Sequence, residues 1–246
     1  MANASLRHPA LALAAACLFT AAASLAGPPG TSPGPAPTAI VLGTEIRTGD
    51  PEELRHLVLR ALTGRYAAER GIEVTPEEIE SYLARMAALA EQDRRERDAR
   101  LAGIERQLAA PGRADDQRAA LTAERDTLKQ LQRGLEQAAA TPQQAEEEAQ
   151  ARRTIAAAFI RQWKINQAIH REYGGRVVFQ QGGPEPLDAY RQFLEERQKS
   201  GAFAIPDQGL EAAFWRYYRD DAIHSFYPAG SAEEARAFAR PWWEAE

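Results

Sequence analysis

The clearest hydrophobic pattern in the chain lies in residues 50–86, where apolar side chains recur three and four positions apart on both sides of a glycine. The first stripe is Leu54, Leu57, Val58, Ala61, Leu62 and Tyr66, and the second is Ile79, Tyr82, Leu83, Met86 and Ala90. This spacing predicts two amphipathic helices, each with one buried face. Asp50 and Thr75 are their predicted N-caps, and Gly71 is expected to end the first helix.

Residues 91–140 keep a helical spacing but are much more polar. Of the ten residues in 91–100, eight are charged and both signs are mixed. Pro111 and Gly112 then separate two arms, whose apolar positions are Leu101, Ile104 and Leu108 in the first and Leu121, Leu128, Leu131 and Leu135 in the second. The heptad-like separations predict an antiparallel helical hairpin with a thin coiled-coil seam. The pattern leaves open whether this hairpin only extends into solvent or binds a partner.

A third long helix is predicted from Pro142 to Tyr173, because its apolar residues return to one face. That face holds Ile155, Phe159, Trp163, Ile169 and Tyr173 and is expected to be buried. Gln162 and Asn166 fall within it, and buried amides need hydrogen-bond partners. Those partners come either from the fold or from the backbone of a bound polypeptide.

The N-terminal 26 residues have the composition of a signal peptide, with Arg7 before a small apolar run and a predicted cleavage after Ala26. Residues 27–37 are rich in Pro and Gly and predict a disordered tether. These features indicate export to the periplasm and no stable membrane insertion after cleavage, while retention of the leader as an anchor stays an alternative. Cys17, the only cysteine, lies in the leader, so the mature chain is expected to lack disulfides and thiolate chemistry.

Few residues offer enzyme chemistry. The net charge of −5 argues against a nucleic-acid partner. The mature part contains His56, His170 and His224, each isolated in sequence, and it carries no zinc-protease, nucleophile-elbow or phosphate-loop motif. We therefore expect no catalytic residues, no metal site and no cofactor.

Residues 38–89 resemble the N-terminal domain of the SurA/PrsA group of extracytoplasmic chaperones. Residues 41–46 read VLGTEI and residues 67–79 read AAERGIEVTPEEI. The family patterns are V-N-G-x-x-I and, at the end of the following helix, A-x-x-x-G-I-x-V-T-D-E-E-I. Two positions depart from them, since Leu42 replaces the usual Asn and Pro76 the usual acidic residue after Thr.

The resemblance implies a mainly α fold: a helical SurA-N-like chaperone module with a short two-stranded β element and a projecting charged hairpin. Residues 38–90 and 141–182 are expected to build the module together, with residues 91–140 inserted between them and residues 183–246 forming an aromatic-rich helical segment. By analogy, residues 40–42 are expected to pair with residues 177–179. Only 73 residues follow Tyr173, and they lack the sequence signature of a parvulin prolyl-isomerase domain.

The resemblance further implies an ATP-independent periplasmic holdase that binds unfolded secreted or outer-membrane polypeptides. A peptide groove of exposed aromatic and apolar side chains is the expected site. Its candidates are Tyr66, Tyr82, Met86, Trp163 and Tyr173, with Phe214, Trp215, Tyr217 and Tyr218 as a second platform. The main alternative is a periplasmic structural or adaptor protein that binds a protein partner through the 91–140 hairpin. A weaker alternative is a protein related to peptidyl-prolyl isomerases.

Overall fold

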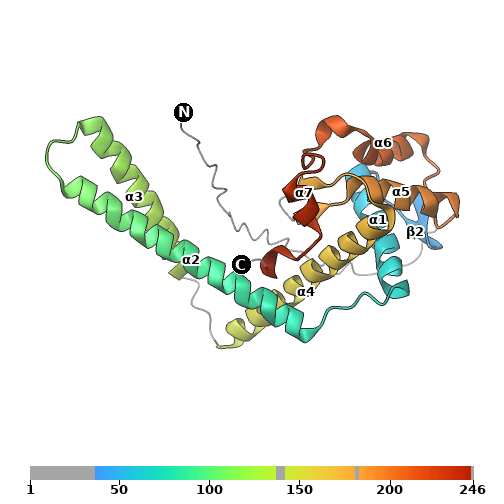
Figure 1. Ribbon diagram of the computed structural model, residues 1–246, viewed down its shortest axis with the longest axis horizontal. Coiled ribbons are helices and arrows are strands. Elements are labelled where there is room, and N and C mark those ends of the chain that lie inside the picture. Colours follow the sequence, from blue (N-terminus) through green and yellow to red (C-terminus); the bar gives the residue numbers. More distant parts are fainter. Residues whose placement is uncertain (1–36, 137–141, 181–182, 245–246) are drawn as a thin grey trace, which may run out of the picture. The chain divides into compact units, whose positions relative to one another are not determined.

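The computed structural model describes residues 37–136, 142–180 and 183–244, so the predicted signal peptide and nearly all of the tether lie outside it. Within these ranges the chain is mainly helical, with seven α-helices and two small antiparallel sheets, which confirms the predicted fold class (Figure 1). The α-helices are α1 (Pro51–Glu69), α2 (Pro76–Ala109), α3 (Asp115–Glu136), α4 (Pro142–Tyr173), α5 (Leu187–Lys199), α6 (Gln208–Arg219) and α7 (Ala232–Ala237). The strands are β1 (Ala39–Val41), β2 (Thr44–Ile46), β3 (Val178–Gln180), β4 (Gly183–Glu185) and β5 (Phe203–Ala204), and two short 3-10 helices are η1 (Asp221–Ile223) and η2 (Trp242–Glu244).

The strands pair differently from the prediction. β1 lies between β2 and β5 in one sheet, and β3 pairs with β4 in the other. The predicted pairing of residues 40–42 with residues 177–179 is therefore wrong. The reason is the turn at Leu42 and Gly43, whose φ angles of 50° and 80° reverse the chain directly after β1 and bring β2 beside it.

Both sheets nevertheless border one larger core, to which α1, α4, α5 and α6 contribute. Val41 of β1 and Val178 of β3 are both buried in this cluster. Its helical members include Leu54, Val58, Leu62, Ile165, Ile169, Tyr190, Phe193, Phe214 and Tyr218. Residues from the beginning and the end of the described chain thus share one hydrophobic interior.

The N-termini of α1 and α2 are capped as the sequence predicts. The Asp50 side chain accepts a hydrogen bond from the Glu52 backbone N–H at 2.9 Å. At the start of α2, the Thr75 hydroxyl accepts from the Glu78 N–H at 3.3 Å, and the Glu78 carboxylate accepts from the Thr75 N–H at 2.8 Å. Gly71 follows α1 with a φ of 62°. These reciprocal bonds satisfy backbone groups that would otherwise lack partners at the helix start.

A smaller second core joins the first half of α2 to α4 and to the C-terminal segment. It consists of Tyr82, Ala156, Ile160, Trp163, Val177, Phe238 and Trp243. Ile155 and Phe159 are exposed, so the prediction that they lie on the buried face of α4 is wrong. The reason is that α4 contributes to two cores: its middle buries Ala156 and Ile160 in the second core, and its C-terminal part buries Ile165 and Ile169 in the larger one.

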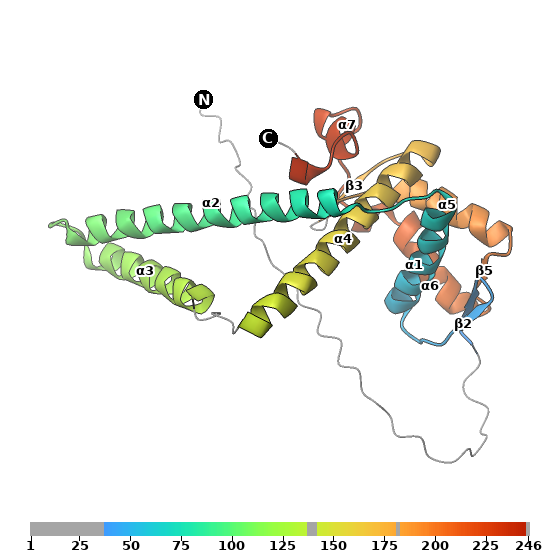
Figure 2. The same cartoon turned by 90° about the horizontal axis from the view of Figure 1, so that it is seen from below.

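Helix α2 is continuous from Pro76 to Ala109, so the predicted domain boundary between residues 90 and 91 lies inside one helix. The second half of α2 and α3 lie side by side as a hairpin (Figure 2). Leu101 and Ile104 are buried, and Arg100 forms a two-bonded ion pair with Glu124 of α3 at 2.7 and 2.8 Å. The hairpin therefore has a narrow apolar seam with charged pairs beside it, and its residues 137–140 lie outside the described ranges.

The segment between α4 and β3 is fixed by Arg176. Its side chain donates to Asp188 of α5 at 2.8 and 3.1 Å and to Asp221 of η1 at 2.7 and 3.0 Å, and its backbone N–H donates to Asp188 at 2.9 Å. Burial alone would raise the pKa of Asp188, but the hydrogen bonds from Arg176 hold that pKa below its ordinary value. Gly175 adopts a φ of 91° beside this carboxylate. Arg176 thus links α5 and η1 to the end of α4.

Candidate functional site

Three hollows lie next to one another around residues 157–166 of α4, and all three are lined by Ala158. We name them together the α4 groove. The link hollow, of about 600 Å³, is lined by Ala67, Ala68, Gly71, Ile72, Glu73, Val74, Ala157, Ala158 and Arg161. The aromatic hollow, of about 410 Å³, is lined by Ala158, Phe159, Gln162, Trp163, Asn166, Gly183, Pro184 and Trp243. The polar hollow, of about 830 Å³, is lined mainly by residues of α1, α4 and the β3–β4 sheet.

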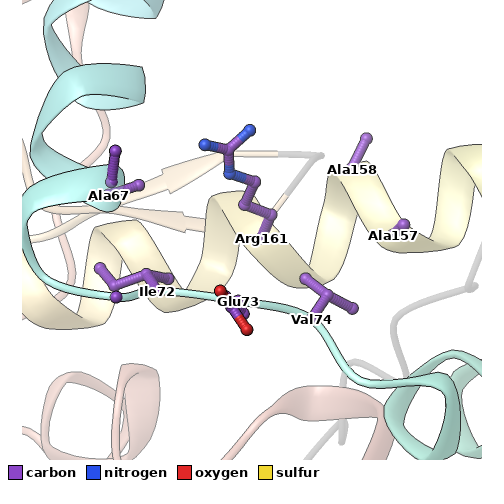
Figure 3. A pocket seen from close by; sticks show the side chains of 9 residues that line it. Ala67, Ile72, Glu73, Val74, Ala157, Ala158 and Arg161 are labelled. Atoms are coloured by element: carbon purple, nitrogen blue, oxygen red, sulfur yellow. The ribbon is translucent and has the colours of Figure 1, made fainter.

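The link hollow forms where the extended segment between α1 and α2 passes small side chains of α4. Figure 3 shows this segment running past Ala157, Ala158 and Arg161. The Lys164 ammonium holds the segment in place, because it donates to the Glu73 carbonyl at 2.7 Å and pairs with Glu78 at 2.5 Å. A hollow remains because the alanine side chains of α4 are too short to fill the space.

The aromatic hollow presents ring surfaces from three elements. Phe159 stacks on Tyr82 with ring centroids 6.3 Å apart and planes 15° apart. The Trp163 and Trp243 rings meet edge to face at 5.8 Å. Among the described residues, the Trp163 Nε1 is buried without a hydrogen-bond partner. The exposed ring of Phe159 therefore rests on a rigid aromatic support, which suits contact with apolar side chains.

The polar hollow contains a hydrogen-bonded network around Glu185. The Glu185 carboxylate accepts from the Tyr217 hydroxyl at 2.7 Å and from the Gln180 amide at 2.8 Å. Burial, followed by the negative charge of Glu185, raises the pKa of Tyr217, so this hydroxyl remains a donor at neutral pH. The Arg55 guanidinium lies 3.7 Å from the centre of the Tyr217 ring. This wall of the hollow is therefore satisfied internally.

Asn166 and Gln162 find their partners within the fold. The Asn166 amide donates to the Pro184 carbonyl at 3.0 Å, and its oxygen accepts from Gln162 at 2.7 Å and from the Tyr190 hydroxyl at 2.5 Å. These bonds fasten β4 to α4 between the aromatic and polar hollows. The sequence left open whether these amides bond within the fold or to the backbone of a bound polypeptide. Their partners come from the fold.

The structure brings only part of the predicted peptide groove together. Trp163 and Tyr217 line the α4 groove, and Tyr82 supports Phe159. Six of the nine candidates are buried, namely Tyr66, Tyr82, Trp163, Phe214, Trp215 and Tyr218. The remaining three are partly buried, Met86 against the second core and Tyr173 and Tyr217 against the larger one.

The prediction of a second aromatic platform on α6 is wrong for three of its four residues, because they are buried. Phe214, Trp215 and Tyr218 lie inside the larger core, because the apolar face of α6 packs against α1 and α5. Tyr217 points instead into the polar hollow network. The spacing of these aromatic residues in the sequence did not show which rings would be buried in the core and which would remain accessible.

Several groove residues were not predicted from the sequence as site residues, notably Arg60, Phe159, Arg161, Pro184 and Trp243. The one sequence signal for the groove is the run of alanines at residues 156–158, directly before Phe159. Three small side chains in a helix that packs on both sides leave room for a hollow on the remaining face.

Comparisons with protein-family models, with curated proteins and with solved structures gave no match. Across the described ranges, no helix combines the length and apolarity that a membrane crossing requires. The same part of the chain contains no group of three or more His, Cys, Asp or Glu side chains arranged to hold a metal ion.

Proposed function

We propose that this protein is an ATP-independent periplasmic chaperone, a holdase that keeps unfolded secreted or outer-membrane polypeptides soluble by binding them along the α4 groove. The observation that carries the proposal is the continuity of the groove. The link and polar hollows share Ala158 and Arg161, and the polar and aromatic hollows share Gln162, Asn166 and Pro184. The three hollows together therefore offer one strip of surface.

The dimensions of the strip suit a short extended segment. Along α4 the groove covers the ten residues from Ala157 to Asn166, and the nine helical rises between them give a length of about 13 Å at about 1.5 Å each. An extended chain rises about 3.3 Å per residue, so about four client residues span this length. A site of this size favours short segments of many sequences over one folded partner.

The apolar surface in the groove supports weak and reversible binding. Phe159 is 43% exposed, and Ile155 is exposed one helical turn before it. Covering the exposed part of one such side chain contributes about 1 kcal/mol. Several contacts of this strength hold an unfolded segment and release it without nucleotide, as a holdase requires.

Two features of the sequence support the same proposal. Residues 38–89 resemble the N-terminal domain of SurA/PrsA chaperones, and the capped corner that carries the resemblance supplies the link hollow of the groove. The predicted signal peptide supports a periplasmic location.

A light-scattering assay tests the proposal with a matched pair of variants. The purified protein is expected to suppress aggregation of an unfolded outer-membrane protein at stoichiometric ratio without nucleotide. Phe159→Ser should weaken this suppression. Phe179→Ser is the control, because Phe179 is also an exposed aromatic residue, at 55%, but lines none of the three hollows. A scattering trace unchanged by the protein would refute the holdase, and equal effects of the two substitutions would refute the groove.

A second candidate function, that of an adaptor, is favoured by the exposed end of α3. Leu131 and Leu135 are exposed there, beside Gly134, and line a hollow of about 390 Å³. Exposed apolar residues on an otherwise charged hairpin are typical of a docking surface. A Leu131→Ser, Leu135→Ser double variant separates the two functions. Loss of partner capture with full suppression of aggregation would favour the adaptor.

A further inference from the structure

In the polar hollow the acidic side chains have partners, whereas two of the arginine side chains have none among the described residues. Its two acidic residues both have partners: Glu185 accepts from Tyr217 and Gln180, and Glu52 lies 3.7 Å from the Arg55 guanidinium. Its cationic residues also include Arg60 and Arg161. The hollow therefore has a surplus of positive charge on a chain whose net charge is −5.

The guanidinium groups of Arg60 and Arg161 form no ion pair or hydrogen bond within the described part of the chain. Both are exposed, and they approach the hollow from α1 and α4, respectively. Arg161 also lines the link hollow, where Figure 3 shows its side chain extending away from Glu73 and toward the end of α1 that carries Ala67. The two guanidinium groups are thus available at the middle of the α4 groove.

We propose that the α4 groove prefers extended client segments in which an Asp or Glu side chain stands two positions from an apolar residue, so that both side chains lie on the same face of the segment. The carboxylate would be bound by Arg60 and Arg161, and the apolar side chain would contact Phe159 in the aromatic hollow. Charge complementarity carries this choice, because guanidinium groups match carboxylates in geometry as well as in sign. The proposal rests on the proposed function and names the class of segment that the groove selects.

Fluorescence anisotropy with labelled peptides tests this preference. Two 12-residue unstructured peptides differ only at one central residue, Glu in one and Gln in the other, and both carry a C-terminal amide so that no terminal carboxylate is present. The Glu peptide should bind about fivefold more tightly at moderate ionic strength, and added salt should reduce the difference. In the Arg60→Gln, Arg161→Gln double variant the two peptides should bind equally.

Arg171→Gln is the matched control. Arg171 is an exposed arginine of the same helix that lines none of the three hollows. If Arg171→Gln abolished the preference as fully as the double variant, the effect would come from overall charge and the inference would be overturned. Equal binding of both peptides by the unmodified protein would overturn the preference and leave the holdase standing. Failure of both peptides to bind would refute the groove as a polypeptide site and this inference with it.

Discussion

Alanine substitutions at the two adjacent glycines after α4 test directly how the end of this helix packs against α5. Gly174 and Gly175 have φ angles of 68° and 91°, in the region that disfavours residues with a Cβ atom. A Cβ added at Gly174 would meet nothing within 4 Å, whereas one added at Gly175 would lie 2.4 Å from the Asp188 Cβ. Alanine at either position therefore has a backbone cost from its positive φ, and only alanine at Gly175 adds a collision.

The expected magnitudes follow from these contacts. A left-handed conformation costs an alanine about 1 kcal/mol relative to glycine. Asp188 is 7% exposed and accepts three hydrogen bonds from Arg176, so it cannot move aside without weakening them. Losing one or two of these bonds costs about 1–2 kcal/mol more, after allowance for the partly exposed guanidinium. We expect Gly174→Ala to lower the free energy of unfolding by about 1 kcal/mol and Gly175→Ala by about 2–3 kcal/mol.

Urea unfolding followed by circular dichroism measures both variants under the same conditions. The comparison depends on the difference between the two substitutions, in which the shared backbone term cancels. Equal losses of stability would show that Asp188 does not pack against Gly175 and would refute the described joint between α4 and α5. A larger loss for Gly174→Ala would refute it as well.

Two other predictions concern a turn and a titrating group. Leu42→Asn should raise the free energy of unfolding by about 0.5–1 kcal/mol, because Asn tolerates the φ of 50° better than Leu and Leu42 is not packed against the core; a lower melting temperature of this variant would contradict the turn geometry. The pKa of Asp188 is lowered in the folded state, so its stabilising effect is complete above the ordinary Asp pKa and is lost as the pH falls below about 4. Asp188→Asn should therefore be less stable at neutral pH and lose less stability between about pH 5 and pH 3 than the unmodified protein, and parallel pH profiles of the two proteins would rule out this role of Asp188.

The sequence was informative wherever a few neighbouring residues determine the structure. The reciprocal bonds of Thr75 and Glu78 depend on side chains three positions apart, and Gly71 ends α1 through its own backbone freedom. The apolar spacing in residues 50–86 likewise predicted which face of α1 is buried. Such features are local, so no knowledge of the remaining chain was needed.

Long-range arrangement was predicted less well, and the reason is physical. Both residues 40–42 and residues 177–179 have strand-forming composition. The partners of the first segment are set by the turn at Leu42 and by the return of β5, more than 150 residues later, whereas β3 pairs with β4, the next strand along the chain. On α4, the sequence could not show that Ile155 and Phe159 would stay exposed, because that depends on where α2 crosses the helix.

The candidate site shows the same limit. The sequence analysis proposed Trp163 and Tyr217 as groove residues because they are aromatic. It could not show that a hollow lies beside each of them. The cations Arg60 and Arg161 lie 101 positions apart in the chain and meet only through the packing of the core. The alanine run at residues 156–158 is the sequence feature that accompanies the groove. It could be interpreted only once the packing neighbours of α4 were known.

Photo-crosslinking during client binding tests the central claim most directly. A photoreactive phenylalanine analogue placed at Phe159, in the α4 groove, or at Phe179, outside it, reports which surface an unfolded polypeptide touches. The account predicts crosslinks to an unfolded outer-membrane protein from position 159 and few or none from position 179. Crosslinks of equal yield from both positions, or from position 179 alone, would contradict it.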